Sequence, residues 1–148
     1  MQREVEFYRK EVQIIKKLIL TKREDELMNF LWDEGRPLIV EEMLDVGGEH
    51  EWGENYLRIM LRSLEKKGAV EACGMVLRGK QYARQFRPAI SKEEFYLRLA
   101  MNRGASAGAL LQVAAAAVMK GKKEDTDEVV RQLEEMLEEY KARTDDEE

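Results

Sequence analysis

Residues 52–68, WGENYLRIMLRSLEKKG, constrain the fold of this chain more than any other segment. At about 100° per residue, Met60, Leu61 and Leu64 stay within about 60° of Leu57, as the core-facing stripe of a helix requires. Gly68 follows as a C-terminal cap signal. The opposite face carries Asn55, Ile59, Arg62 and Lys66. The segment therefore predicts a helix that packs on a core and turns a basic face either to an anionic partner or to solvent.

The distribution of charge favours the anionic partner. The chain as a whole has a net charge of -5, yet residues 50–90 hold 8 Lys/Arg against 4 Asp/Glu. Binding to phosphates depends on the local density of cations and not on the net total. An acidic chain can therefore carry a nucleic-acid interface in its basic middle segment.

Length and composition indicate the domain number of the chain and argue against a membrane, disulfide-bonded or metal-binding protein. With 148 residues, 44% hydrophobic and 37% charged, the chain fits one compact domain of about 100 residues and an accessory element. The longest apolar run, residues 107–119, is too short to span a bilayer and no signal peptide opens the chain, so we expect a cytoplasmic protein. One cysteine, Cys73, and one histidine, His50, predict no disulfide and no transition-metal site. We expect no cofactor.

The order of helix and strand signals is that of a winged helix-turn-helix domain. Thr21 with Glu24 forms a capping box, and two short strands follow the basic helix as a hairpin, or wing. The expected elements are helices at 4–20, 22–34, 40–46 and within 52–68, a brief strand at 36–39, hairpin strands at 69–73 and 80–86 flanking a GMVLRG loop, helices at 92–101 and 106–120, and a last helix capped by Thr126.

These signals predict an α+β, mostly helical fold. Its parts are an extra N-terminal amphipathic helix, a winged helix-turn-helix DNA-binding domain, a C-terminal helical dimerisation region and a disordered acidic tail. We place them at residues 1–20, 21–90, 91–142 and 143–148, respectively.

The sequence also resembles the BlaI/MecI penicillinase-repressor family. The resemblance rests on ELMNFLWDEG at 26–35, NYLRIMLRSLEKKGAV at 55–70, GK at 79–80 and QFRPAISKEE at 85–94. It implies a winged-helix repressor that binds operator DNA as a homodimer joined through its C-terminal helices. It also implies a membrane sensor-protease system that ends repression by cleaving the repressor. Residues 113–123 do not reproduce the cleavage site of the best-known members, and the cysteine cluster of copper-responsive relatives is absent.

The candidate DNA contacts lie on the basic helix and near the wing tip. Tyr56 and Ile59 replace two threonines of the family's helix and Ser63 replaces an arginine, all at positions expected to approach DNA. An apolar Ile59 could touch a thymine methyl or meet a protein, Trp52 could pack or contact phosphate, and the tip cations could grip DNA or be solvated. The full set is Trp52, Asn55, Tyr56, Arg58, Ile59, Arg62, Lys66, Arg78 and Lys80.

An apolar stripe on the last helix, together with the small-residue helix before it, needs a larger partner surface than one short winged domain offers. We expect the partner to be a second copy of the chain. The predicted dimer contacts are Leu110, Leu111, Val129, Leu133, Met136, Leu137 and Tyr140.

Two functions of different classes remain open on the sequence alone. The first is a homodimeric repressor that binds a pseudo-palindromic operator. The alternative is a winged-helix protein–protein interaction module that has lost specific DNA binding, in which Tyr56 and Ile59 contact another protein. No nucleophile, base and orienting group recur at catalytic spacing, so we do not expect an enzyme.

Overall fold

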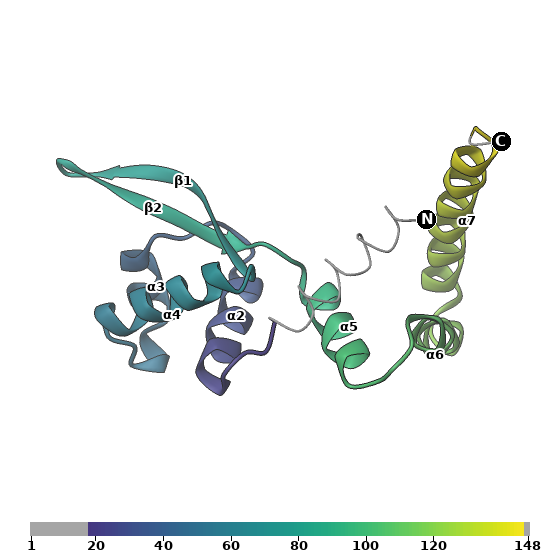
Figure 1. Ribbon diagram of the computed structural model, residues 1–148, viewed down its shortest axis with the longest axis horizontal. Coiled ribbons are helices and arrows are strands. Elements are labelled where there is room, and N and C mark those ends of the chain that lie inside the picture. The colour runs from purple at the N-terminus through teal and green to yellow at the C-terminus, as the bar shows by residue number, and fades with distance from the viewer. Residues whose placement is uncertain (1–17, 147–148) are drawn as a thin grey trace, which may run out of the picture. The chain divides into compact units, whose positions relative to one another are not determined.

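The structure, a computed structural model, describes residues 18–146 and divides the chain into two compact units after Gly104. Among these residues, the first unit contains four α-helices, a short 3₁₀ helix and a two-stranded hairpin. The second unit contains two α-helices (Figure 1). In chain order the elements are α2 (Lys22–Glu34), α3 (Val40–Val46), the short 3₁₀ helix η1 (Gly48–His50), α4 (Glu54–Lys66), β1 (Val70–Arg78), β2 (Gln81–Pro88), α5 (Lys92–Asn102), α6 (Ala107–Met119) and α7 (Lys123–Asp145).

Helix α2 begins where its capping box predicts. The Thr21 hydroxyl accepts a hydrogen bond from the Glu24 backbone N–H at 3.2 Å, and the Glu24 carboxylate accepts one from the Thr21 N–H at 3.1 Å. Gly35 ends the helix with φ +65°, which an L side chain would resist. The amphipathic helix predicted at 4–20 falls almost entirely outside the described residues, and residues 18–20 are not helical.

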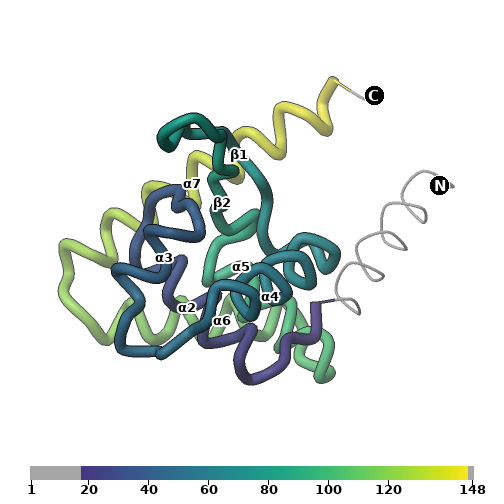
Figure 2. The backbone as a smooth tube through the Cα atoms, turned by 90° about the vertical axis from the view of Figure 1, so that its left-hand side faces the viewer, coloured from purple at the N-terminus to yellow at the C-terminus, as the bar shows by residue number. Residues whose placement is uncertain are grey.

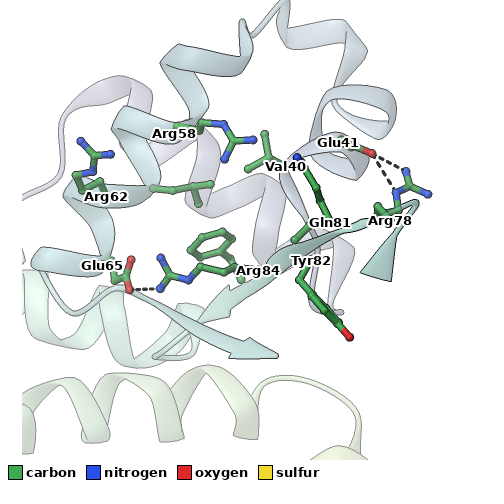
Figure 3. Close-up of a pocket in the computed structure, with 12 residues that line it drawn as sticks. Val40, Glu41, Arg58, Arg62, Glu65, Arg78, Gln81, Tyr82 and Arg84 are labelled. Atoms are coloured by element: carbon green, nitrogen blue, oxygen red, sulfur yellow. Dashed lines mark hydrogen bonds and ion pairs between the residues drawn. The ribbon is translucent and has the colours of Figure 1, made fainter. Parts of the chain in front are cut away.

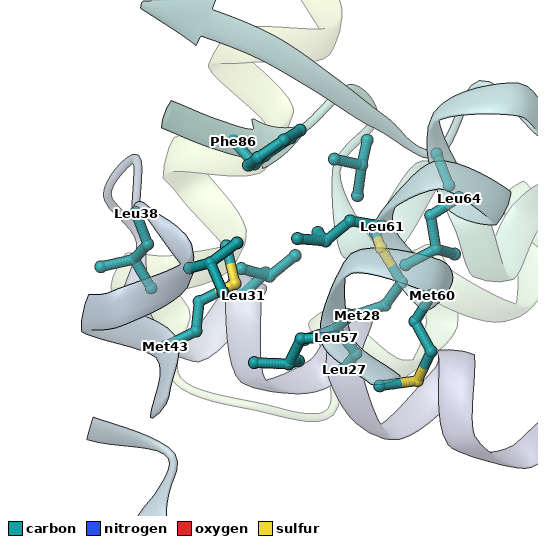
Figure 4. Packing of buried hydrophobic residues seen from close by; sticks show 13 residues of the cluster. Leu27, Met28, Leu31, Leu38, Met43, Leu57, Met60, Leu61, Leu64 and Phe86 are labelled. Atoms are coloured by element: carbon teal, nitrogen blue, oxygen red, sulfur yellow. The ribbon is translucent and has the colours of Figure 1, made fainter. Parts of the chain in front are cut away.

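The core forms where α2, α3 and α4 meet the base of the hairpin (Figure 4). The strand predicted at 36–39 is a single bridge, in which Leu38 and Phe86 exchange backbone hydrogen bonds of 3.0 and 2.8 Å. This bridge ties the α2–α3 connection to β2. The buried cluster comprises Leu27, Met28, Leu31, Leu38, Val40, Met43, Leu57, Met60, Leu61, Leu64, Ala69, Val70 and Phe86.

The wing is longer than the sequence predicted. The GMVLRG segment is not a loop, because its residues pair with β2 and continue β1 to Arg78. The turn is only Gly79 and Lys80, with φ +61° at Gly79, as a two-residue hairpin turn with glycine first requires. A bulge between Ala72 and Gly74 interrupts the ladder. Figures 1 and 2 show the hairpin standing out from α2, α3 and α4.

Helix α5 belongs to the first unit, although the sequence grouped it with the C-terminal helices from residue 91 onward. The Trp32 indole N–H donates to the Ile90 carbonyl at 3.0 Å. Phe95 is 3% exposed, with its ring centroid 5.5 Å from that of Trp32. The first unit therefore extends beyond residue 90, because an aromatic contact holds α5 against α2.

The second unit consists of α6 and α7, and none of its described side chains is buried. The prediction that Thr126 caps the last helix is wrong, since α7 begins at Lys123. The Thr126 hydroxyl instead donates to the carbonyls of Val118 at 2.9 Å and Lys122 at 3.2 Å. Helix α7 continues to Asp145, so residues 143–145 are helical where a disordered tail was predicted. Over residues 18–146, no helix has the length and apolar character needed to cross a membrane.

Candidate nucleic-acid interface

The orientation of α4 is fixed by its apolar side. Leu57 and Leu64 are fully buried, and Met60 and Leu61 are at most 4% exposed, as the periodicity of the sequence predicted. A helix anchored along one stripe must turn the opposite stripe to solvent. We call that opposite stripe the exposed face of α4; it consists of Asn55, Arg58, Ile59, Arg62 and Lys66, all of them exposed.

A buried carboxylate holds the C-terminal end of α4 against α2. Glu24 is 4% exposed and accepts hydrogen bonds from the Lys67 ammonium at 2.7 Å and from the Ser63 hydroxyl at 3.1 Å. The Lys67 ammonium also donates to the Ile19 carbonyl at 3.0 Å. Ser63 stands at a position expected to approach DNA, and in this structure its hydroxyl is directed to Glu24. We call Glu24, Ser63 and Lys67 the Glu24 cluster.

Two opposing effects set the pKa of Glu24. Burial alone would raise this pKa, because it disfavours the charged carboxylate. Hydrogen bonds from Lys67, Thr21 and Ser63 favour the charged form and together outweigh burial, so the pKa of Glu24 lies below its ordinary value of 4.5. Glu24 is therefore ionised at neutral pH and attracts Lys67 electrostatically.

Replacing Glu24 by glutamine should lower the free energy of unfolding at pH 7 by about 1–3 kcal/mol, because Lys67 and Ser63 lose a charged acceptor. The pKa of Glu24 is lower in the folded than in the unfolded chain, so its contribution is complete above about pH 4.5 and disappears as the pH falls through the folded value. The difference between wild type and Glu24→Gln should thus narrow in acid. Urea unfolding at pH 7 and pH 3 measures this difference in the free energy of unfolding. Glu26→Gln, at an exposed position on the same helix, is the control. Equal stabilities at pH 7 would show that the Glu24 cluster contributes nothing.

A groove of about 400 Å³ separates α4 from the wing and α3 (Figure 3). The Arg84 guanidinium bonds Glu65 of α4 at 2.7 Å and lies 5.1 Å from the centre of the Phe86 ring. Arg78 bonds Glu41 of α3 at 3.0 Å. We call this the α4–wing groove; its lining residues are Val40, Glu41, Arg58, Leu61, Arg62, Glu65, Arg78, Gln81, Tyr82, Ala83, Arg84 and Phe86.

Arg84 is a candidate contact that the sequence analysis missed. It lies two residues from both Tyr82 and Phe86 along β2, and side chains two residues apart lie on the same face of a strand. Since Phe86 is the apolar anchor of that face, the period-2 pattern was the signal that would have placed Arg84 beside α4.

The cations of this surface differ in their partners. Among the residues that the structure describes, Arg62, Lys66 and Lys80 form no ion pair, whereas Arg58 pairs with Glu54 at 2.9 Å. Both side chains of that pair are more than half exposed. Exposed ion pairs are worth about 0–1 kcal/mol, so an incoming phosphate can replace the carboxylate at little cost.

Trp52 and Tyr56 are half-buried, and their contacts are with the protein itself. Trp52 stacks on His50 with a centroid distance of 4.2 Å and meets Phe30 edge to face at 5.3 Å. A Cβ atom at Gly47 would lie 2.9 Å from the Trp52 ring, so glycine makes room for it. The Arg23 guanidinium lies 5.2 Å from the centre of the Tyr56 ring. Packing accounts for both aromatic residues.

The residues predicted to form the dimer fall into two groups within the second unit. Leu110, Val129 and Leu133 are half-buried. The others are largely exposed: Leu111 at 56%, Met136 at 64%, Leu137 at 56% and Tyr140 at 62%.

A comparison of the sequence with models of protein families finds a match. Residues 20–139 match the profile of the penicillinase repressors. The chain belongs to the penicillinase repressor family. The resemblance to BlaI/MecI repressors is thus confirmed, as is the winged helix-turn-helix fold. The penicillinase repressor family is a family of transcriptional regulators.

The match to the penicillinase repressors covers both units. It begins before α2 and ends within α7, so the matched range includes the exposed Leu111, Met136 and Leu137 of the second unit and stops one residue before Tyr140. Residues 1–19 fall outside it. No curated protein matches the chain.

Proposed function

We propose that this chain is a homodimeric transcriptional repressor that binds operator DNA. The exposed face of α4 enters the major groove and the wing contacts the flanking backbone. One observation carries the proposal: Arg58, Arg62 and Lys66 project from one stripe of a helix whose opposite stripe is locked in the core. A helix held in this way can present cations and polar side chains to base edges and phosphates without losing its packing.

The wing adds cations beside that helix. Arg84 lies next to Glu65 of α4 and Arg78 next to Glu41 of α3, and Lys80 occupies the turn. Because these ion pairs are about half exposed, they hold the wing near α4 in the free protein and can be exchanged for phosphates on DNA. The wing is therefore suited to contacting the backbone beside the groove that α4 occupies.

A second copy of the chain is the proposed partner of α6 and α7. With no side chain buried among residues 105–146, these helices cannot form a stable core alone. A symmetric pair would bury Leu111, Met136, Leu137 and Tyr140 in a shared interface. Two recognition helices would then meet half-sites about one helical turn apart, on a pseudo-palindromic operator.

A gel-shift titration of the protein with DNA from upstream of its own gene tests this function. We expect a complex that survives excess nonspecific DNA and weakens steeply as salt rises, because binding releases counterions. A footprint of two symmetric protected segments would identify the operator. Failure to form any complex below micromolar protein at low salt would refute the proposal.

Ile59 keeps a second candidate function under consideration, that of a protein-interaction module. Its side chain is 62% exposed, and an apolar side chain in this position gains free energy only when a partner covers it. Salt separates the two functions, since a predominantly apolar protein interface responds weakly to salt where a DNA complex dissociates.

Glu41→Gln should tighten operator binding about fivefold. The substitution frees Arg78 from its carboxylate and removes a negative charge beside the wing, a change on the order of 1 kcal/mol. Glu128→Gln is the matched control, because it alters net charge equally and removes one of the two carboxylates that pair with Arg131 on α7. Unchanged or weaker binding by Glu41→Gln would mean that Arg78 stays away from DNA.

A further inference from the structure

We infer that Ile59 reads a thymine: each half-site of the operator contains a T whose 5-methyl group packs against the Ile59 side chain in the major groove. The inference rests on the proposed function and adds to it the base chemistry of the site. Thymine alone among the four bases of DNA presents a methyl group there, beside its O4 acceptor.

The position of Ile59 excludes an internal role. It lies midway along α4, on the stripe opposite Leu57, Leu61 and Leu64, and its side chain is 62% exposed. The core already fills the other side of the helix, so no packing among residues 18–104 requires an isoleucine there. A β-branched residue also has a lower helix propensity than alanine or lysine, so the position gains nothing from local structure.

The neighbours of Ile59 identify the kind of partner. One turn away on the exposed face lie Asn55 and Arg62, and Arg58 precedes it directly; all are exposed. A protein interface centred on Ile59 would bury the charged side chains of Arg58 and Arg62, whereas the cores of protein interfaces are depleted in charge. DNA matches the pattern, because phosphates flank the major groove on both sides and the floor offers both acceptors and the thymine methyl.

The side chain is also suited to recognising a methyl group. In a helix, isoleucine populates essentially one χ1 rotamer, so its γ2 methyl group is held in place before DNA arrives. Contact with one methyl removes apolar surface from water and should contribute about fourfold in affinity per half-site. Cytosine and uracil, which lack the methyl, would lose that factor.

Substitution of single thymines by deoxyuridine in the operator fragment tests the inference, because it removes only the methyl group. In the wild-type protein, one such substitution in each half-site should weaken binding about fourfold, and both together about 15-fold. Ile59→Ala should bind the unmodified operator correspondingly less tightly and should be insensitive to the same substitutions. Ile19→Ala is the matched control, because Ile19 is also 62% exposed but lies outside α4. It should behave like wild type.

The outcomes separate this inference from the function on which it rests. If the wild type binds the operator in a salt-dependent way but no thymine responds to deoxyuridine, Ile59 does not read a methyl group and DNA binding stands. Sensitivity that persists in Ile59→Ala likewise overturns the assignment. Absence of any DNA binding overturns both. Thermal unfolding of Ile59→Ala should match that of wild type, since the residue is exposed.

Discussion

Replacing both Arg62 and Lys66 by alanine should weaken operator binding by about three orders of magnitude near 0.1 M salt. These cations project from the exposed face of α4, and neither forms an ion pair with any residue from 18 to 146. They are therefore available to phosphates and base edges without breaking an internal contact. Two lost contacts in each of two half-sites, at about 1 kcal/mol each, give a loss of this size.

The salt dependence of binding distinguishes this loss from a folding defect. Each phosphate contact contributes about 0.9 to the slope of log K against log salt, so the double variant should lose about two per protomer. Lys141→Ala with Arg143→Ala is the control: both residues are exposed on α7 and the change in net charge is equal. Equal affinity of wild type and the Arg62/Lys66 variant for the operator would place the DNA on another surface.

Leu137→Glu should dissociate the dimer. Leu137 is 56% exposed within one chain, and a symmetric interface would bury two copies of it. Losing both contacts and burying two carboxylates amounts to about 3–6 kcal/mol, or a 10²- to 10⁴-fold weaker association. Sedimentation velocity over a range of concentrations measures the change.

Gln132→Glu is the matched control for Leu137→Glu, because it adds the same charge to α7 without removing an apolar side chain. Operator affinity should fall together with dimerisation, since a monomer engages only one half-site. Circular dichroism should still show the helices of the first unit, because Leu137 is not part of that unit's buried cluster. A Leu137→Glu protein that remains dimeric would exclude this stripe from the interface.

Local signals in the sequence located most of the described helices, although the start of α7 was misplaced. The capping box at Thr21 and the glycine at Gly35 bound α2 at the predicted residues, because caps depend on chemistry within one turn. The hairpin was misjudged for the opposite reason. Its length depends on which residues of β1 and β2 pair across the turn, and the glycines at 74 and 79 looked alike although only Gly79 lies in the turn.

The geometry of the candidate interface was predictable from the sequence only in part. Amphipathic periodicity fixed the exposed face of α4, since burying the leucines leaves only one direction for the remaining side chains. The hydrogen bond of Ser63 was not foreseen, because its partner, Glu24, is 39 residues away in the sequence. Arg84 was overlooked because its place beside α4 follows from a strand pairing and not from its neighbours along the chain.

The bulge in β1 decides which groups the outer half of the wing displays. Cys73 stands outside the ladder, so Ala72 and Met75, three residues apart, both lie on the face of Phe86 and Arg84. Leu77 and Tyr82 then follow on the same face, where all three large apolar side chains are more than half exposed. A ladder that counted every residue would present glycine and valine there instead. The single extra residue thus gives one face of the outer half of the hairpin an exposed apolar stripe.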